Sequence, residues 1–192
     1  VTPASYELAR AMALAARQAG GRALFVGGWV RDRLLGIDST DVDLEVYGLP
    51  AGRLHALLEG FGRVDTVGAS FTVYKVGGID VSLPRRESKV APGHRGFEVT
   101  GDPSMSVAEA ARRRDFTVNA VLWDPLTGEY LDPVRGRIDI QRKILRAVDA
   151  ATFGDDSLRV LRALQFAARF GFAMHPAPRR LSAGLPLDDL AS

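Results

Sequence analysis

Residues 23–47 read Ala-Leu-Phe-Val-Gly-Gly-Trp-Val-Arg-Asp-Arg-Leu-Leu-Gly-Ile-Asp-Ser-Thr-Asp-Val-Asp-Leu-Glu-Val-Tyr. This stretch predicts a short apolar strand, a glycine pair at the start of a helix, a polar loop and a second strand. Because Gly27 and Gly28 carry no Cβ, their N–H groups can approach a ligand closely, and the helix N-terminus favours an anion. Arg31, one turn into the helix, adds a positive charge suited to phosphate. The pattern therefore predicts a phosphate cradle.

Two acidic residues follow on the second strand. Because alternate residues of a strand point to the same face, Asp41 and Asp43 project together, whereas Val42 and Leu44 face the core. Two neighbouring carboxylates repel each other and have raised pKa values unless a cation lies between them. Mg²⁺ is bound by carboxylate oxygens together with substrate phosphates. A glycine pair followed by an acid pair therefore indicates a nucleoside triphosphate bound with Mg²⁺.

Each of these motifs also has a purely structural explanation. A glycine pair before a helix is an ordinary strand–helix turn, and alternating acids on a strand commonly face solvent. Their occurrence in one order, as strand, glycine pair, helix and acidic strand, favours the functional interpretation.

The composition indicates a single globular unit. The chain has 192 residues, 46% of them hydrophobic, which is enough to bury one core with a short appendage. The absence of cysteine excludes disulfides, thiolate zinc sites and cysteine nucleophiles, and a cytoplasmic location is its simplest interpretation. The sequence shows neither a membrane-spanning run nor a signal-peptide pattern. A net charge of +2 permits contact with nucleic acid without requiring it.

Residues 71–83 predict a β-hairpin, in which two apolar runs flank the turn Gly77-Gly78. The register of this hairpin places Lys75 opposite Asp80. Asp80 then has two interpretations. Either it forms a surface cross-strand ion pair worth roughly a few tenths of a kcal/mol, or it faces the acid pair of the neighbouring strand as a third catalytic acid.

Helical spacing of apolar residues predicts helices at residues 4–19, 51–61 and 155–170. The first two are interpreted as packing helices without chemistry. In the third, the residues expected to form the buried stripe are Leu158, Leu161, Leu164 and Ala168.

Residues 84–106 are rich in glycine, proline and arginine and predict a polar loop of more than twenty residues. Ser106 and Glu109 then form a capping box for a helix that is expected to extend to Ala120. Three consecutive arginines, 112–114, lie on this helix, and by themselves they would be ordinary solvated charge.

The first stretch resembles the head domain of class II tRNA nucleotidyltransferases, the CCA-adding enzymes, and of bacterial poly(A) polymerases, which belong to the DNA polymerase beta superfamily. The motifs that carry the resemblance are Gly27-Gly28, Val30-Arg31-Asp32, Leu34-Leu35-Gly36 and Asp41-Val42-Asp43-Leu44. The similarity continues over nearly all of the chain. It implies a catalytic head in residues 1–150 and the start of a helical neck in residues 151–192, without the family's body and tail.

The expected fold is α/β. We predict a DNA polymerase beta-like palm with a mixed, largely antiparallel sheet of about five strands and helices packed on it, followed by an α-helical neck.

The resemblance also implies roles for individual residues. Asp41 and Asp43 would bind two Mg²⁺ ions and be catalytic, with Asp80 as the candidate third acid. The residues that the family motifs place at the sugar and triphosphate are Gly27, Gly28, Arg31, Arg113, Arg114, Asp115 and Asn119. Those placed at the base are Asp156, Arg159 and Arg162, although Asp156 by itself is also an ordinary helix N-cap.

Asp156 and Arg159 lie three residues apart and share one helix face. A carboxylate only accepts hydrogen bonds and a guanidinium only donates them. Cytosine and adenine present an amino donor beside a ring-nitrogen acceptor, so the pair matches C and A and is mismatched to U and G. Each buried group left unpaired costs about 1–3 kcal/mol. Two residues depart from the family pattern, because Asp155 stands in place of glutamate and Gln165 in place of a frequent arginine.

The expected activity is template-independent addition of CMP and AMP, from CTP and ATP, to the 3′ end of tRNA, with release of pyrophosphate. Within the enzyme class, a bacterial poly(A) polymerase and a CC-only or A-only adding enzyme share these motifs. Outside it, the main alternative is a non-catalytic nucleotide- or RNA-binding module, which would have no need for two facing acids. A small-molecule nucleotidyltransferase would have no need for the Asp156–Arg159 pair.

Overall fold

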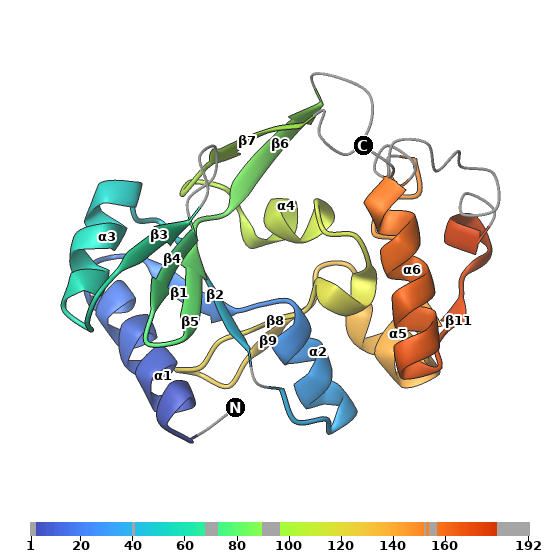
Figure 1. The fold of residues 1–192 in the computed structure, drawn as a ribbon, viewed down its shortest axis with the longest axis horizontal. Helices are drawn as coiled ribbons and strands as arrows, with labels where there is room; N and C mark the ends of the chain where they lie inside the picture. The colour runs from blue at the N-terminus through green and yellow to red at the C-terminus, as the bar shows by residue number, and fades with distance from the viewer. Residues whose placement is uncertain are drawn as a thin grey trace.

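The computed structural model describes residues 3–39, 41–67, 73–89, 97–151, 153 and 157–179. Within these ranges, every helix is too short or too polar to traverse a lipid bilayer. Figure 1 shows a β-sheet in one half of the molecule and a group of helices in the other, with a two-stranded ribbon projecting above them.

A seven-stranded sheet forms the centre of the fold, in the order β3-β4-β5-β2-β1-β8-β9. Its strands are β1 (Arg22–Phe25), β2 (Val42–Tyr47), β3 (Asp65–Val67), β4 (Val73–Val76), β5 (Ile79–Ser82), β8 (Leu122–Trp123) and β9 (Tyr130–Leu131). Among these described strands, β2 and β5 pair in parallel and the other neighbours pair antiparallel. The predicted mixed, largely antiparallel sheet is confirmed. The expected number of about five strands was too low, because β3, β8 and β9 are too short to show an alternating pattern.

The helices are α1 (Pro3–Gln18), α2 (Gly28–Leu35), α3 (Ala51–Glu59), α4 (Val107–Arg112), α5 (Gly136–Arg142) and α6 (Ser157–Phe170), with a short 3₁₀ helix η1 (Thr117–Asn119). Two small ladders complete the fold: β6 (Arg85–Lys89) with β7 (Phe97–Gly101), and β10 (Ile144–Leu145) with β11 (Ala173–Met174). Figure 1 places α1 and α3 together at the sheet and α6 with β11 at the far end of the molecule.

The central strand β1 is buried on both faces, which explains its uninterrupted apolar sequence. Phe25 packs into the larger core cluster, which includes the inner face of α1. Leu24 points to the other side and packs with Ala110 of α4 and Leu122 of β8. A strand covered on both sides shows a continuous apolar run instead of alternation. This packing on both faces of β1 fixes the position of the glycine pair that follows the strand.

The predicted hairpin is confirmed in its turn and its register. Gly77 and Gly78 have φ values of 56° and 81°, which the two central residues of this turn require and glycine adopts without strain. Lys75 lies opposite Asp80, as the spacing predicts.

The segment predicted as a long polar loop contains a β-ribbon, because residues 85–89 and 97–101 pair antiparallel from Arg85–Gly101 to Lys89–Phe97. The base of the ribbon is closed by a hydrogen bond from the Asp102 N–H to the Pro84 carbonyl, at 2.7 Å. Strand β6 reads Arg-Arg-Glu-Ser-Lys and shows no apolar alternation, so the sequence pattern did not predict the ribbon.

The helix that begins at the predicted capping box ends earlier than expected. Ser106 and Glu109 form the box, but α4 stops at Arg112. Beyond it, the Thr117 N–H donates to the Arg146 carbonyl at 3.0 Å, and the Val148 N–H donates to the Asp115 carbonyl at 3.1 Å. Long-range backbone pairing therefore replaces the helical bonds that local propensity favours.

The buried stripe predicted for α6 was wrong. Leu158, Leu161 and Leu164 are 40%, 40% and 50% exposed, and Ala168 is exposed as well. The buried side is formed by Val160 and Ala163, continued by the half-buried rings of Phe166 and Phe170. Apolar residues on both faces of α6 have helical spacing. The face that is buried is the one whose rings contact aromatic side chains from the rest of the fold, Phe116 and Phe172.

The predicted division of the chain after residue 150 remains a prediction. Across that boundary, β10 and β11 pair in parallel, so that the segment after α6 returns to the segment before it.

Gly136, the first residue of α5, provides a test of this packing. A Cβ placed there would lie 2.0 Å from the Thr117 carbonyl oxygen and 2.8 Å from Val121 Cγ2. Because the nearest atom belongs to the backbone, we expect Gly136→Ala to lower the free energy of unfolding by about 3 kcal/mol or more, the upper part of the range for overpacking. Urea denaturation followed by circular dichroism measures it.

Gly52→Ala is the matched control, since Gly52 lies in α3 with open space around the added methyl group. It should leave stability unchanged or raise it by up to about 1 kcal/mol. A Gly136→Ala variant as stable as the wild type would contradict the close packing of α5 on η1.

Candidate active site

Three carboxylates gather where β2 and β5 run side by side. Asp43 of β2 is the register partner of Asp80 of β5, and at matching positions of parallel strands the two side chains point to the same face. Asp41 lies just before β2, exposed, whereas Asp43 is half-buried. The pKa of Asp43 is raised by burial first and then by the negative charges of Asp80 and Asp41. The acids are therefore close enough to repel one another.

This acid group fits a hard divalent cation. A cation among the carboxylates would relieve the repulsion that raises the pKa of Asp43. Among the residues that the structure describes, no three acidic or histidine side chains form a complete metal cluster. Mg²⁺ commonly uses one or two carboxylates and completes its shell with water and substrate phosphates. The donor set of Asp41 and Asp43 suits that mode of binding.

Both interpretations of Asp80 are compatible with the structure. The Lys75 ammonium lies 2.6 Å and 2.7 Å from the two carboxylate oxygens of Asp80, which is the predicted cross-strand ion pair. At the same time Asp80 raises the pKa of Asp43, so its charge reaches the acid pair. Its role as a third catalytic acid remains a prediction.

The glycine pair lies directly beside the acids. Gly27 caps α2 with φ 68°, a backbone conformation that glycine adopts readily. A Cβ on Gly27 would lie 3.4 Å from Asp43 Oδ2 and 3.7 Å from Arg114 Nη1. The Gly27 backbone at the N-terminus of α2 therefore lies between an acid and a guanidinium group.

Two arginines that follow α4 supply the positive side of the site. The Nη2 atoms of Arg113 and Arg114 donate to Glu45 Oε2 at 2.7 Å and 3.1 Å. Glu45 lies on β2, two residues after Asp43, and is 1% exposed. Its other carboxylate oxygen accepts a hydrogen bond from the Tyr47 hydroxyl at 2.5 Å. Burial and the Glu45 charge raise the pKa of Tyr47, which keeps its hydroxyl a donor.

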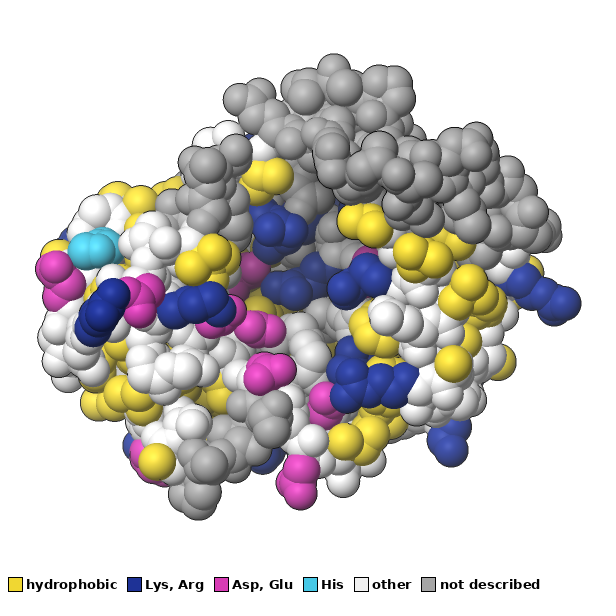
Figure 2. All heavy atoms as spheres, in the orientation of Figure 1, with side chains coloured by type: hydrophobic (Ala, Val, Ile, Leu, Met, Phe, Trp, Pro, Cys, Tyr) yellow, Lys and Arg dark blue, Asp and Glu magenta, His cyan; other side chains and the backbone are white. Residues whose placement is uncertain are grey.

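The two charged groups face a common pocket of about 200 Å³. Its lining residues are Val26, Asp43, Glu45, Val73, Asp80, Ser82, Arg85, Arg113 and Arg114. Figure 2 shows a hollow in the middle of this face, with Lys and Arg side chains inside it and Asp and Glu side chains along the edge toward the sheet. Acids on one side and arginines on the other suit a polyphosphate held together with a metal cation.

Arg31, which was expected to offer its charge to phosphate, is buried and bonded to other side chains. It is 5% exposed, and its guanidinium donates to Asp32 Oδ1 and to Asn119 Oδ1, each at 2.8 Å. The guanidinium carbon also lies 4.4 Å from the centre of the Phe170 ring on α6. Asn119 in turn donates to Asp115 Oδ1 at 3.1 Å. Asp115 and Asn119 are therefore hydrogen-bonded to each other, although they do not lie on one continuous helix. Contact of Arg31 with phosphate remains a prediction.

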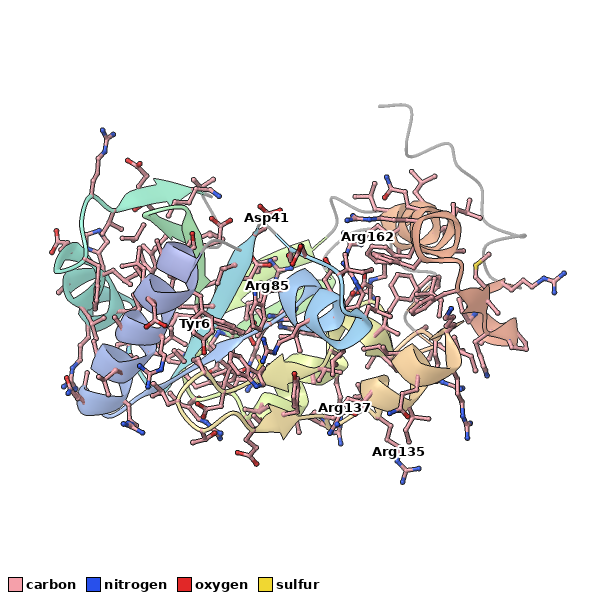
Figure 3. The ribbon with its side chains drawn as sticks, turned by 90° about the horizontal axis from the view of Figure 1, so that it is seen from below. Tyr6, Asp41, Arg85, Arg135, Arg137 and Arg162 are labelled. Carbon is pink, nitrogen blue, oxygen red and sulfur yellow. The ribbon has the colours of Figure 1, made fainter. Side chains whose placement is uncertain are left out.

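Helix α6 reaches this network through Arg162, whose Nε donates to Asp115 Oδ2 at 2.8 Å. Arg159, one turn earlier on α6, is half-buried. In Figure 3, Asp41 and Arg162 lie on the same side of the molecule, whereas Arg135 and Arg137 lie on the opposite side. The early acids and the late helix therefore lie on the same side of the molecule. The predicted base-reading partner Asp156, with Asp155, lies outside the described residues.

Comparison with known proteins agrees with this geometry. A family model described as the poly A polymerase head domain matches residues 23–146. The chain belongs to this family. Among the relatives of this poly A polymerase head domain, the multifunctional CCA protein of Xanthomonas oryzae pv. oryzae is 41% identical over 174 residues, which cover 86% of the chain and 41% of the relative. The multifunctional CCA protein of Stenotrophomonas maltophilia strain K279a is 43% identical over 147 residues, which cover 76% of the chain and 35% of the relative.

Solved structures show the same fold. The CCA-adding enzyme of Bacillus stearothermophilus in complex with CTP is similar with a TM-score of 0.75 and 32% identity, over 94% of the chain and 43% of that structure. The Thermotoga maritima CCA-adding enzyme complexed with tRNA_CCA has a TM-score of 0.75 and 26% identity, over 95% of the chain and 42% of that structure. The chain spans about two fifths of the length of the curated relatives.

Two charged pocket residues of this head domain, Glu45 and Arg85, were not predicted from the sequence. Glu45 had a usable signal, because the alternation that pairs Asp41 with Asp43 continues to Glu45 and Tyr47 on the same face. For Arg85 the sequence offered no such signal, since this residue lies at the start of the β6–β7 ribbon, which was not predicted.

The raised pKa of Asp43 leads to a prediction about stability and pH. A carboxyl group whose pKa is higher in the folded than in the unfolded protein stabilises the fold while it is protonated. For Asp43 this contribution is complete below the ordinary pKa of 3.8, and it is lost as the pH rises through the pKa of the folded protein. At pH 7 the ionised Asp43 is therefore destabilising. We expect Asp43→Asn to raise the free energy of unfolding at pH 7 without Mg²⁺, and the gain to disappear below pH 3.8. Urea denaturation at several pH values measures it.

Asp102→Asn is the control of opposite sign. The pKa of Asp102 is lowered, first by the hydrogen bond from the Ser104 hydroxyl and further by Arg86, so its ionised form stabilises the fold above its ordinary pKa. This variant should lose stability at pH 7. An Asp43→Asn variant that loses stability at pH 7 would show that the acids do not repel each other in the folded protein.

Proposed function

We propose that this head domain belongs to a template-independent RNA nucleotidyltransferase that adds CMP and AMP, from CTP and ATP, to the 3′ end of tRNA. The observation that carries the proposal is the pocket in which Asp43 and Asp80 face Arg113 and Arg114 beside the N-terminus of α2. The names of the relatives, multifunctional CCA proteins, and the CCA-adding enzymes solved with CTP and with tRNA_CCA support it.

The triphosphate would lie between the two charged sides of the pocket. The N–H groups at Gly27 and Gly28 and the guanidinium groups of Arg113 and Arg114 donate to phosphate oxygens, in the manner of a helix N-terminus and an arginine clamp. Binding there places the α-phosphorus near the acids, and the 3′-hydroxyl of the RNA approaches from the open side.

The reaction joins the RNA 3′ oxygen to the α-phosphorus and breaks the bond to the β-phosphate, so that pyrophosphate leaves. Asp41 and Asp43 would hold two Mg²⁺ ions, which when bound lower the pKa of the attacking hydroxyl and stabilise the charge on the leaving pyrophosphate. The proton of the 3′-hydroxyl passes to a carboxylate of the acid group, with Asp80 as the third member, held by Lys75.

Base selection is assigned to α6. Asp156 accepts the amino hydrogen of C or A and Arg159 donates to the adjacent ring nitrogen, so the protein supplies the complementary edge without a nucleic-acid template. Arg162, held by Asp115, places this helix against the triphosphate-binding motif. A cytoplasmic location goes with this proposal as an expectation.

The description of the matching family favours a second candidate, a bacterial poly(A) polymerase. Incubating the intact protein with tRNA that lacks its 3′ end and one nucleotide at a time separates the two. A CCA-adding enzyme adds CMP before a single AMP, whereas a poly(A) polymerase extends the RNA with ATP alone.

The acid pair provides the direct test of catalysis. We expect Asp41→Asn to lower the rate of CMP incorporation at least about 1,000-fold, since several kcal/mol of transition-state stabilisation would be lost, while the fold is kept. Incorporation of labelled CMP into the shortened tRNA measures it. Asp65→Asn is the control, because Asp65 is an exposed acid on edge strand β3 that pairs with Arg63. Wild-type activity in the Asp41→Ala/Asp43→Ala double variant would refute the assignment.

The base-reading proposal predicts a change of specificity. Arg159→Ala should reduce the preference for CTP over UTP about 10-fold or more, because a lost hydrogen bond to a buried partner is worth about 1–3 kcal/mol. The ratio of kcat/KM values for the two nucleotides measures it. Arg142→Ala, an exposed arginine at the end of α5, should leave the ratio unchanged. An unchanged ratio in Arg159→Ala would remove Arg159 from the base site.

A further inference from the structure

We propose that Glu45 is a positioning residue for triphosphate binding: its buried carboxylate fixes the guanidinium groups of Arg113 and Arg114 in the orientation that receives the phosphates. The proposal rests on the function proposed above, because it names what orients the phosphate-binding side of that same pocket. Glu45 itself would touch the arginines and not the nucleotide.

The Glu45 carboxylate is held at both of its oxygens. Oε2 accepts hydrogen bonds from Arg113 Nη2 at 2.7 Å and Arg114 Nη2 at 3.1 Å, while Oε1 accepts from the Tyr47 hydroxyl at 2.5 Å. The side chain is 2% exposed, so each of these bonds forms away from bulk water. Hydrogen bonds to a buried ionised group are short and strong, and they define its orientation.

The Glu45 carboxylate also determines the direction of the arginine N–H groups that it does not itself bind. A guanidinium group is planar and rigid, so holding one nitrogen of it constrains the other two. Arg114 uses Nη2 for Glu45, and its Nη1 lies beside Gly27 at the mouth of α2. The buried Nε of Arg114 has no hydrogen-bond partner among the described residues. The Nη1 group of Arg114 therefore lies beside the glycine cradle, where a phosphate oxygen would accept hydrogen bonds from it.

A different role for Glu45 would be simple charge neutralisation, and the two roles predict opposite results. One carboxylate faces two guanidinium groups, so the arginine side keeps a net positive charge. If Glu45 only reduced that charge, its removal would strengthen the attraction for phosphate. If Glu45 positions the arginines, its removal lets two long side chains move. Phosphate affinity then falls, because these side chains lose conformational entropy when phosphate binds.

Glu45→Gln tests the proposal, since it keeps the size of the side chain and one acceptor oxygen but removes the charge. The probes are CTP, inorganic triphosphate and cytidine, titrated calorimetrically at constant Mg²⁺. We expect the Kd for CTP and for inorganic triphosphate to rise about 10-fold or more, which corresponds to about 1.4 kcal/mol, and the Kd for cytidine to stay unchanged. In addition assays, KM for CTP should rise more than kcat falls. Unchanged or tighter binding of inorganic triphosphate would overturn the proposal.

Two further variants separate positioning from loss of structure. Glu109→Gln makes the same chemical change in the capping box of α4, the helix that leads to Arg113, and should lower stability without changing the affinity for inorganic triphosphate. Tyr47→Phe removes one of the bonds that hold Glu45 and should raise the Kd for inorganic triphosphate about 2- to 10-fold, the value of one hydrogen bond. If Glu45→Gln does not fold, unchanged binding in Tyr47→Phe overturns the proposal.

The outcome for Glu45 is distinguishable from that for the proposed function. Wild-type protein that binds neither CTP nor inorganic triphosphate would refute the nucleotidyltransferase proposal. Wild-type protein that binds both, together with a Glu45→Gln variant that binds them equally well, would refute only the positioning role.

Discussion

Asp43 and Asp80 lie side by side because β2 and β5 pair in parallel, and the surrounding structure depends on this juxtaposition of like charges. Their repulsion is increased by the partial burial of Asp43, which makes the arrangement unfavourable for folding by itself. Sheet formation does not require acids here, since the positions on the opposite face of β2 hold Val42, Leu44 and Val46 in the core. Proteins tolerate such locally unfavourable arrangements at functional sites, where a ligand restores the balance.

The neighbouring charges compensate for this repulsion in an ordered way. Lys75 pairs with Asp80 on one side, and the positive charge of Arg114 opposes the rise in the pKa of Asp43 on the other. Arg114 is in turn held by Glu45. The like-charged pair of Asp80 and Asp43 therefore lies between two cations, Lys75 of β4 and Arg114 after α4, and Gly27 leaves space beside Asp43 and Arg114. A nucleotide with its metal ions would add phosphates next to the arginines and cations next to the acids.

Features encoded by neighbouring residues were predictable from the sequence. The hairpin register that sets Lys75 opposite Asp80 follows from a two-glycine turn, and the pairing of Asp41 with Asp43 follows from strand alternation. Features decided by distant partners were not. Helix α4 ends at Arg112 because residues 115–117 pair with residues 146–148. The residues next to Arg112 in the sequence do not indicate that pairing. The leucines of α6 face outward because aromatic side chains from elsewhere in the fold occupy its other face.

The ladder of β10 and β11 anchors the C-terminal end of α6. Only a short connection separates the end of α6 at Phe170 from β11 at Ala173, whereas a longer segment leads into its N-terminus. The C-terminal end of α6 is held in addition by the contact between Phe170 and Arg31. Arg159 lies eleven residues from Phe170, which is roughly 16 Å along a helix. Any rotation of α6 about this end would therefore displace Arg159 much further than the ring of Phe170.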